Sequence, residues 1–389
     1  LTLQFPLQDN IREEAHICIT RAHLEEDTAK LSHGTKGETY VDFNRAGVPL
    51  VEIVTDPDFK TALEAKTYCQ ELQLIMRYLG VSDADMEKGH MRCEANISLQ
   101  EAGTFEIVDG IVKTLSGHTL NNKVELKNIN SFKAVEKAIE FEIALQTAML
   151  ETGETWVQQT RGWDEDKGET ILQRTKENAA DYRYFPDPDI PPFHPNKLPQ
   201  ASLPELPQTK RNRFHAEYGF SYADSKILTD SKAWAHFTEN VMSELVDWLY
   251  SLTEVKGESD EIKEGRKQKI ARLAGGWLTS KLMGMMKERS IAVTNLSFSA
   301  ENFAELIALC YTERVNSTNA QKILVEMLDS ETDLDPTHIM EEKGYGMIQD
   351  TDALQKVVEE VIKNYPAQVE QFKSGKDPVI KFLIGMAMK

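Results

Sequence analysis

Residues 186–207 contain eight of the fourteen prolines in this chain of 389 residues. This density of proline excludes both a helix and a central strand, because each proline lacks a backbone donor and fixes φ. We therefore predict an extended linker here, with separately folded parts on either side of it. The first predicted domain spans residues 1–195.

Before the linker, the sequence mixes strand and helix patterns. Residues 91–99 alternate between apolar and polar side chains, which predicts a half-buried strand with one polar face. An antiparallel sheet can present such a face to solvent or to a ligand. Thr61 and Glu64 form a capping box that opens a helix, and Gly80 ends that helix. A second helix is predicted at about residues 132–150.

After the linker, the pattern is almost wholly helical. The predicted helices cover residues 241–250, 270–286, 301–311 and 319–328. A weaker break at residues 329–346 precedes a last helical unit with one apolar stripe. The predicted fold class is therefore α+β. It comprises a mostly antiparallel sheet domain, an all-helical domain at residues 196–328 and a small helical tail domain at residues 329–389.

The cysteine content and the charge limit the kinds of protein this chain can be. The four cysteines form no C-x-x-C pair, so neither a disulfide framework nor a zinc knuckle is expected, and a cytoplasmic location is predicted. The apolar stretches are too short to span a membrane. The formal net charge of −19 repels nucleic acid at a distance, so RNA binding would need local basic patches. One candidate patch comprises Lys263, Arg266, Lys267, Lys269 and Arg272.

Several common enzyme classes are excluded because their motifs are missing. The chain has no G-x-x-x-x-G-K-[ST], G-x-G-x-x-G, H-E-x-x-H or G-x-S-x-G motif. A P-loop ATPase, a Rossmann oxidoreductase, a zinc peptidase and an α/β-hydrolase are therefore set aside.

Four glutamates of the first domain stand in positions that suggest a metal site. Glu52 interrupts an apolar run that otherwise resembles a buried strand, where an ionised carboxylate needs a cation or hydrogen-bond donors. Glu26 ends a strand-like stretch, Glu94 lies on the polar face of residues 91–99, and Glu125 lies between two lysines. Carboxylates from several strands on one sheet face suit a Mg²⁺ ion that handles ATP phosphates. We therefore predict that these four glutamates are metal ligands that meet in one cavity.

Basic, amide and aromatic side chains complete the predicted site. Positive charge stabilises the oxygens of a transferring phosphoryl group. The predicted catalytic residues are Arg45, Arg92 and Lys127. The residues predicted to bind the nucleotide are Lys123, Asn96 and Tyr184. Tyr184 belongs to an aromatic and basic cluster at residues 181–186 that can stack on adenine or on RNA bases. The predicted cofactors are ATP and Mg²⁺.

Each of these patterns has an alternative interpretation. Glutamates beside lysines on a strand often form a solvated face, and structural ion pairs imitate functional sites. Tyrosines beside prolines often pack a loop. The basic run at residues 263–272 also contains Glu264, which is typical of a solvated helix face.

Eight stretches of the chain resemble one known family. They are residues 23–30, 42–54, 78–82, 91–98, 125–132, 160–164, 181–189 and 203–207. Their order and spacing resemble those of the B subunits of the tRNA-dependent amidotransferases. The match is strong up to residue 207 and looser in the helical remainder, where residues 385–389 resemble the last helix of the family.

This resemblance implies a fold and a reaction. The fold would be a cradle-shaped, kinase-like domain followed by the helical and tail domains. The reaction would be phosphorylation by ATP of the side-chain carboxylate of Glu-tRNA(Gln) or Asp-tRNA(Asn), then displacement of phosphate by ammonia. The enzyme would be a glutamine-hydrolysing carbon–nitrogen ligase. Relative to the family, we expect an N-terminal part and the C-terminal end of the tail domain to be missing from this chain.

The resemblance also implies partners. They are a glutaminase (A) subunit that supplies ammonia, a small tethering (C) subunit and the mischarged tRNA, with no membrane and no DNA. Two alternatives stay open: a non-catalytic tRNA-binding scaffold of the same fold, and an unrelated metal-dependent ligase or kinase with a small-molecule substrate.

Overall fold

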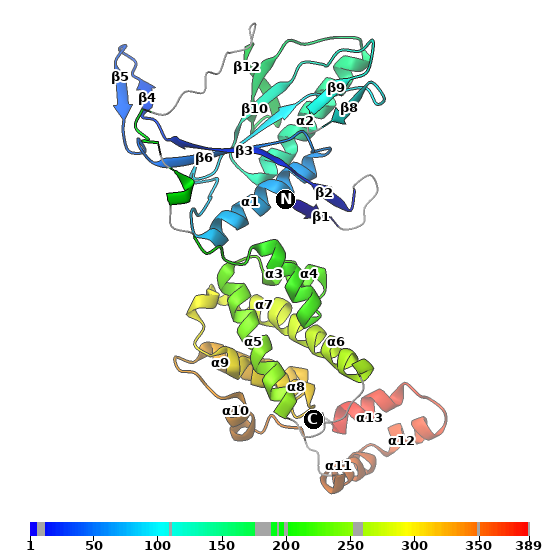
Figure 1. Cartoon of the computed structure of the whole chain (residues 1–389). Helices are drawn as coiled ribbons and strands as arrows, with labels where there is room; N and C mark the ends of the chain where they lie inside the picture. Colours follow the sequence, from blue (N-terminus) through cyan, green and yellow to red (C-terminus); the bar gives the residue numbers. More distant parts are fainter. Residues whose placement is uncertain are drawn as a thin grey trace. The chain divides into compact units, whose positions relative to one another are not determined.

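The computed structural model describes residues 1–5, 12–108, 111–175, 188–192, 194–197, 201–251, 260–347 and 351–387 (Figure 1). The chain divides into two compact units, Leu1–Leu206 and Pro207–Lys389. The boundary falls within the proline-rich segment. A further division of the second unit at residue 329 stays a prediction.

The first unit mixes strands and helices. Its strands are β1 (Thr2–Gln4), β2 (Glu14–His16), β3 (Ile19–Glu26), β4 (Lys30–His33), β5 (Thr39–Asp42), β6 (Pro49–Thr55), β7 (Cys93–Ile97), β8 (Phe105–Val108), β9 (Ile111–Thr114), β10 (Val124–Ile129), β11 (Gln159–Asp164) and β12 (Glu169–Thr175). Its helices are α1 (Ala62–Leu79), α2 (Phe132–Glu151) and the short 3-10 helix Pro195–Lys197. A mixed α and β architecture, as predicted, is therefore confirmed for the part of the chain that precedes the linker.

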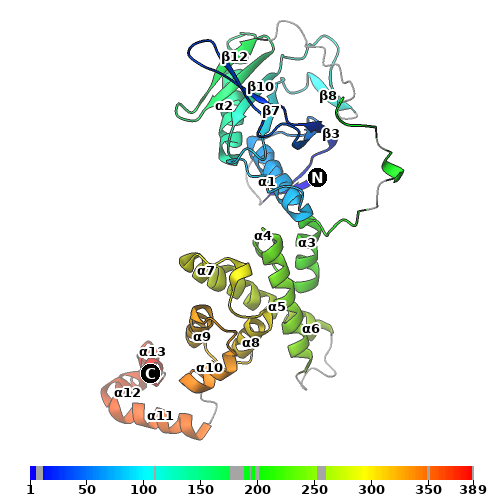
Figure 2. The ribbon, with the colours of Figure 1, turned by 90° about the vertical axis from the view of Figure 1, so that its left-hand side faces the viewer.

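A four-stranded sheet forms the centre of this unit. Its strand order is β12-β11-β10-β7. The β10–β11 pair is parallel, whereas the β7–β10 and β11–β12 pairs are antiparallel. Helix α2 connects the two parallel strands and packs on one face of the sheet, as Figure 2 shows. Among the described helices, α2 makes the main contacts with these strands, so the opposite face can present polar side chains.

The core between the sheet and α2 is mostly apolar. Val124 and Leu126 of β10 are completely buried there, together with Ala138 of α2. Burial of a valine or leucine side chain contributes about 1.5–3 kcal/mol relative to exposure. The sheet therefore offers a rigid base for the side chains on its other face.

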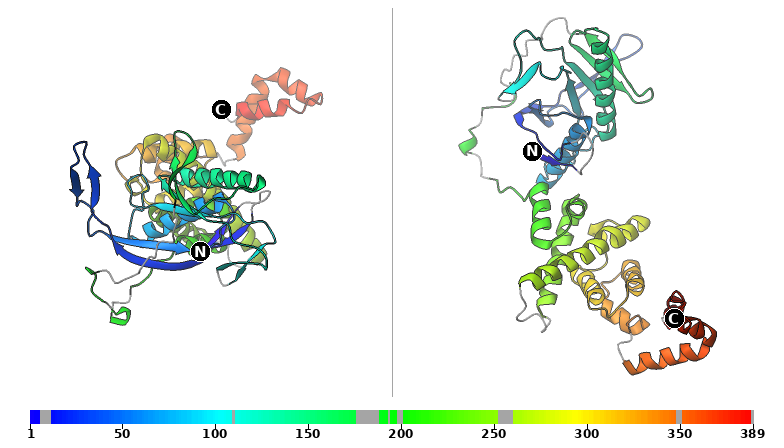
Figure 3. Two further views of the ribbon diagram at one scale, coloured as in Figure 1. Left: turned by 90° about the horizontal axis from the view of Figure 1, so that it is seen from above. Right: turned by 90° about the vertical axis from the view of Figure 1, so that its right-hand side faces the viewer.

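The remaining described strands of this unit pair in twos. The pairs are β1–β2, β3–β6, β4–β5 and β8–β9. In Figure 3 the β4–β5 hairpin stands at the far end of the β3–β6 ribbon. Leu24 and Val51 lie opposite each other on this ribbon, and both are exposed.

The helix boundaries in this unit follow from capping residues that the sequence reveals. Thr61 accepts a hydrogen bond from the backbone N–H of Glu64 at the start of α1, and Gly80 ends the helix with φ +70°. Ser131 accepts a hydrogen bond from Ala134 N at the start of α2. The predictions of α1 and α2 are confirmed.

The described residues of the second unit form helices joined by turns and short loops. Its α-helices are α3 (Pro207–Arg213), α4 (Tyr222–Leu228), α5 (Lys232–Ser251), α6 (Asp260–Gly276), α7 (Met283–Arg289), α8 (Ala300–Tyr311), α9 (Ser317–Asp329), α10 (Pro336–Lys343), α11 (Thr351–Asn364), α12 (Pro366–Lys373) and α13 (Val379–Ala387). Two π-helical turns, Phe214–Tyr218 and Trp277–Leu282, and the 3-10 helix Val293–Asn295 complete it. The helix predicted at residues 270–286 is in fact α6 and α7 joined through the second π-helical turn.

The packing of these helices is apolar. Helix α5 packs on α8, and α11, α12 and α13 contact one another. Phe214, Phe220 and Phe303 are fully buried. None of the helices in the described ranges is both long enough and apolar enough to cross a membrane.

Candidate functional site

The uncovered face of the four-stranded sheet carries the main group of polar side chains. Neighbouring residues of a strand point to opposite faces. Because Val124 and Leu126 point into the core, Glu125 and Lys127 point to the uncovered face. Asn96 of β7 and Thr160 of β11 lie directly opposite Glu125 in their ladders. We call the side chains of Glu94, Asn96, Glu125, Lys127 and Thr160 the polar face.

Lys127 lies between two carboxylates on the polar face. Its Nζ donates to Glu94 Oε1 at 2.9 Å and to Glu94 Oε2 at 3.0 Å. The same Nζ lies 3.5 Å from Glu125 Oε1. Burial alone would lower the pKa of Lys127, but the hydrogen bonds and charges of Glu94 and Glu125 outweigh it and raise that pKa. Lys127 is therefore a cation at neutral pH. The carboxylates of Glu94 and Glu125 both lie next to its ammonium group.

Thr160 supports this group from the neighbouring strand. Its side chain is buried, with an exposed fraction of 1%. Its Oγ1 donates to Glu125 Oε2 at 2.8 Å. Our sequence predictions did not include Thr160. The only signal was its place in residues 160–164, because the sequence does not reveal that β11 pairs with β10.

The geometry of Glu94 and Glu125 fits a magnesium ion. Mg²⁺ takes oxygen ligands and is usually held by one or two carboxylates together with water and phosphate oxygens. Both carboxylates already share one cation, the Lys127 ammonium, at 2.9 Å and 3.5 Å. Two carboxylates without a sulfur or imidazole donor are a hard ligand set, as this ion requires.

Glu52 lies on a different sheet and is not buried. Its side chain is 48% exposed and pairs with Arg21 Nη2 at 3.1 Å. The prediction that Glu52 lies in a buried strand is wrong. The physical reason is that β6 pairs only with β3 among the described strands, so the apolar run around Glu52 has no second layer to cover it.

Glu26 and Glu52 are also not brought together. The β3–β6 register places Glu52 opposite His23 and Glu26 opposite Pro49. Glu26 is three residues from His23, so Glu26 and Glu52 point to opposite faces of the ribbon. Among the described residues, neither glutamate joins Glu94 and Glu125 in a group of at least three close ligand atoms. The expectation of one cavity shared by all four glutamates is wrong, whereas the individual role of each as a ligand stays a prediction.

The predicted basic residues occupy different surroundings. Arg45 Nε pairs with Asp27 Oδ2 at 2.7 Å, and Arg45 Nη1 donates to the backbone oxygen of Gly89 at 3.1 Å. Arg92 and Lys123 are exposed and lie just before β7 and β10. Their catalytic and nucleotide-binding roles stay predictions.

The aromatic cluster at residues 181–186, which includes Tyr184, lies outside the described residues. The nucleotide-binding role of Tyr184 therefore stays a prediction. Asn96 lies on the polar face opposite Glu125, and its nucleotide-binding role also stays a prediction.

A cavity of about 490 Å³ lies where β10 and β11 end. Its lining residues are Asn128, Asn130, Ser131, Trp163, Asp164 and Glu165. Asn128 has φ +60° at a bulge in the β7–β10 ladder, so its side chain leaves the regular alternation of the strand. The volume is within the range of small-molecule sites. Because Lys127 directly precedes Asn128, the cavity adjoins the polar face along the chain.

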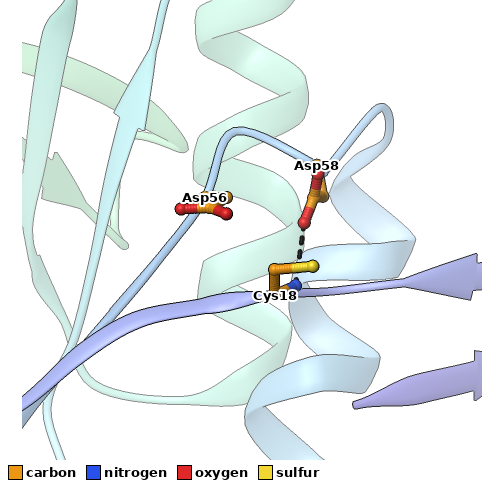
Figure 4. Close-up of side chains that lie close together, drawn as sticks. All are labelled: Cys18, Asp56 and Asp58. Carbon is orange, nitrogen blue, oxygen red and sulfur yellow. Dashed lines mark hydrogen bonds between the residues drawn. The ribbon is translucent and has the colours of Figure 1, made fainter. Parts of the chain in front are cut away.

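A second group of potential metal ligands was missed by the sequence predictions. Ligand atoms of Cys18, Asp56 and Asp58 all lie within 4.8 Å of one another. Figure 4 shows Asp58, whose Oδ2 accepts a hydrogen bond from Cys18 N at 2.8 Å. The charge of Asp58 raises the pKa of the Cys18 thiol, and sulfur is a soft ligand, whereas Mg²⁺ prefers oxygen. This group therefore fits Mg²⁺ less well than the polar face does.

The basic patch predicted in the second unit lies on α6. Lys267 Nζ donates to the backbone oxygen of Ala216 at 3.0 Å. Lys269 Nζ lies 5.2 Å from the ring centroid of Tyr311. Arg272 is exposed. Lys267 thus has a structural contact, whereas Lys269 and Arg272 are better placed for phosphate groups.

Comparisons with known proteins agree on one family. Residues 3–198 match the family model described as the GatB/GatE catalytic domain, and residues 260–389 match the model described as the GatB domain. A relative from Acaryochloris marina is 38% identical over 96% of this chain and 70% of its own length. Relatives from Coxiella burnetii and Persephonella marina are 39% and 40% identical, each over 96% of this chain and 72% of their own length. Each of the three carries the name of the B subunit of an aspartyl/glutamyl-tRNA(Asn/Gln) amidotransferase.

Proposed function

Since the chain belongs to the family of B subunits of the aspartyl/glutamyl-tRNA(Asn/Gln) amidotransferases, we propose that it activates the mischarged amino acid with ATP. A side-chain carboxylate oxygen of tRNA-linked glutamate or aspartate attacks the γ-phosphorus of ATP, and ADP leaves. Ammonia then attacks the acyl phosphate, loses a proton, and inorganic phosphate leaves. The product is the amide on the same tRNA.

The observation that supports this proposal most strongly is Lys127 between Glu94 and Glu125 on the polar face. We assign the two carboxylates to hold Mg²⁺, which when bound would neutralise charge on the ATP phosphates. Lys127, kept protonated by its neighbours, would stabilise the charge that phosphoryl transfer spreads over the phosphate oxygens. Arg92 and Lys123 are further candidates for this role, and the cavity next to Asn128 is the candidate position for the nucleotide or the aminoacyl end.

The rest of the proposal concerns the setting of this reaction. The mixed α and β first unit is compatible with the kinase-like cradle that the family resemblance implies. Activation by ATP is chemically necessary because a carboxylate is a poor acyl donor. We propose that a glutaminase (A) subunit supplies the ammonia and that a small (C) subunit tethers the two. The basic side chains of α6 would contact tRNA phosphates.

The decisive experiment uses the assembled amidotransferase that contains this chain. Mischarged tRNA, ATP, Mg²⁺ and ammonium chloride are combined, and ADP and amide are measured together. The proposal expects one ADP for each amide and no amide without Mg²⁺ or ATP. Binding of tRNA without any ATP cleavage would instead identify the chain as a scaffold. ATP cleavage that is indifferent to tRNA would point to a small-molecule ligase or kinase.

A further inference from the structure

Thr160 holds one oxygen of the Glu125 carboxylate. The two residues are direct neighbours in the parallel β10–β11 ladder. A carboxylate can only accept hydrogen bonds, so the 2.8 Å contact is a donation from Thr160 Oγ1 to Glu125 Oε2. The threonine side chain is β-branched and therefore stiff about χ1. Its hydroxyl is thus a fixed point against which the more flexible glutamate is oriented.

The direction of this hydrogen bond is set by a third residue. Arg174 Nε of β12 donates to Thr160 Oγ1 at 3.4 Å. An arginine has no acceptor, so Thr160 accepts from Arg174 and directs its own hydrogen to Glu125. Oε2 of Glu125 is thereby turned towards β11, and Oε1 is the oxygen that lies 3.5 Å from Lys127 Nζ.

We propose that Thr160 is a positioning residue that presents Glu125 Oε1, together with the Glu94 carboxylate, to a divalent cation. This inference rests on the proposed function, which places Mg²⁺ at these two carboxylates. Groups that hydrogen-bond to metal ligands orient them, and removing such a group typically lowers metal affinity by about 10–100-fold. Thr160 would act through Glu125 and would not touch the substrate.

The same sheet contains a matched control on its covered face. Thr170 Oγ1 donates to Glu142 Oε2 at 3.1 Å and accepts from Arg161 Nε at 2.8 Å. Thr170 is also buried, with an exposed fraction of 3%. The arginine–threonine–glutamate arrangement therefore occurs twice, once on the polar face and once against α2. Only the first adjoins the proposed cation site.

The test measures binding of Mn²⁺, used as a probe for Mg²⁺, to the assembled amidotransferase without ATP. Free Mn²⁺ is followed by electron paramagnetic resonance for the wild type and for Thr160→Val, Thr160→Ser, Thr170→Val and Glu125→Gln. We expect Thr160→Val to raise the Kd about tenfold. Thr160→Ser retains the hydroxyl and should stay within about threefold of the wild type. Thr170→Val should lose stability much as Thr160→Val does but keep the wild-type Kd.

Activity gives a second readout. Thr160→Val should need about tenfold more Mg²⁺ for half-maximal ATP cleavage, and its kcat should recover at saturating Mg²⁺. A kcat that stays low at every Mg²⁺ concentration would contradict a role in cation binding.

Three outcomes would overturn the inference. The first is a wild-type Kd for Mn²⁺ in Thr160→Val while Glu125→Gln binds Mn²⁺ weakly. This result would exclude the positioning role of Thr160 but keep the proposed cation site. The second is an equal loss of Mn²⁺ affinity in Thr160→Val and Thr160→Ser, or in Thr160→Val and Thr170→Val. Either result would show that a folding defect is responsible. The third is an unchanged Kd in Glu125→Gln, which removes the proposed cation site and this inference together.

Discussion

The central sheet and the β3–β6 ribbon both place a glutamate between apolar neighbours, with opposite structural results. Glu125 lies between Val124 and Leu126, which are completely buried. Glu52 follows Val51, which is 47% exposed. The local patterns are similar, but α2 covers one face of the sheet, whereas the ribbon has two strands and exposes apolar side chains as well as charges.

This difference shows how a carboxylate is held in a fixed position. The strand that carries Glu125 packs on an apolar core through Val124 and Leu126. Thr160 donates a hydrogen bond to the Glu125 carboxylate. Glu52 has an exposed ion pair with Arg21, and such pairs contribute only about 0–1 kcal/mol. An alternating sequence pattern therefore predicts a strand. Whether a side chain on that strand is held in place depends on the other elements that pack on the strand.

The largest expected difference between the two regions is in stability. Leu126→Ala should lower the free energy of unfolding of the first unit by about 2–5 kcal/mol, because it leaves a cavity against α2. Val51→Ala should cost less than about 1 kcal/mol, because Val51 is half exposed. Urea unfolding followed by circular dichroism measures both. Similar costs for the two substitutions would show that the ribbon is covered in solution.

The second difference is in activity. Glu125→Gln should reduce tRNA-dependent ATP cleavage by about a hundredfold or more, since a charged ligand to the cation is lost. Glu52→Gln should reduce it less than about fivefold, as expected for an exposed ion pair. Both are compared at equal Mg²⁺ in the assembled enzyme, with tRNA affinity measured separately. A loss of activity in Glu52→Gln that matches Glu125→Gln would restore Glu52 as a metal ligand.

A third carboxylate, that of Glu64, has a structural role that depends on pH. Glu64 of α1 is fully buried, and its Oε1 accepts from Arg12 Nε at 2.7 Å. Burial alone would raise the pKa of Glu64, but hydrogen bonds from Arg12 and the backbone N–H of Lys60 outweigh it and lower that pKa. The ion pair therefore stabilises the fold above the unfolded-state value of about 4.3. This contribution is lost as the pH falls through the folded-state pKa.

Glu64→Gln should accordingly lower the free energy of unfolding by about 1–3 kcal/mol at pH 7. The difference from the wild type should shrink as the pH is lowered below about 4.3. Urea titrations at a series of pH values measure this. A difference that is constant between pH 7 and pH 3 would mean that charge on Glu64 contributes nothing.

The smallest expected effect concerns RNA binding by the second unit. Lys269→Glu should weaken tRNA binding about threefold to tenfold and reduce the slope of log affinity against log salt by about 1. The matched control is Lys322→Glu, because Lys322 Nζ also lies 5.2 Å from a tyrosine ring centroid, that of Tyr345. Lys322 is outside the basic patch, so the control should leave the slope unchanged. Equal effects of the two substitutions would make the α6 patch an ordinary solvated helix face.

Much of the local structure was predictable because its causes are local. Thr61 and Gly80 mark the ends of α1 through capping hydrogen bonds within a few residues. The strand predicted at residues 91–99 is confirmed for Cys93–Ile97 (β7), where Cys93 and Ala95 pack against the core while Glu94 is exposed.

The parts that were not predictable depend on pairing between distant segments. The place of Thr160 beside Glu125 follows from a parallel ladder between strands that are separated by the whole of α2. The Cys18, Asp56 and Asp58 group arises because β3 and the end of β6 lie side by side. The exposure of Glu52 likewise depends on how many strands join β6, which its own sequence does not contain.

We propose that the carboxylates of Glu94 and Glu125 hold the Mg²⁺ ion that accompanies ATP. The most direct test is anomalous X-ray scattering from crystals of the assembled amidotransferase with Mn²⁺ and a non-hydrolysable ATP analogue. We expect a manganese peak between the Glu94 and Glu125 carboxylates, with phosphate oxygens of the analogue among its ligands. A peak among Cys18, Asp56 and Asp58, or beside Glu52, with none on the polar face, would contradict it.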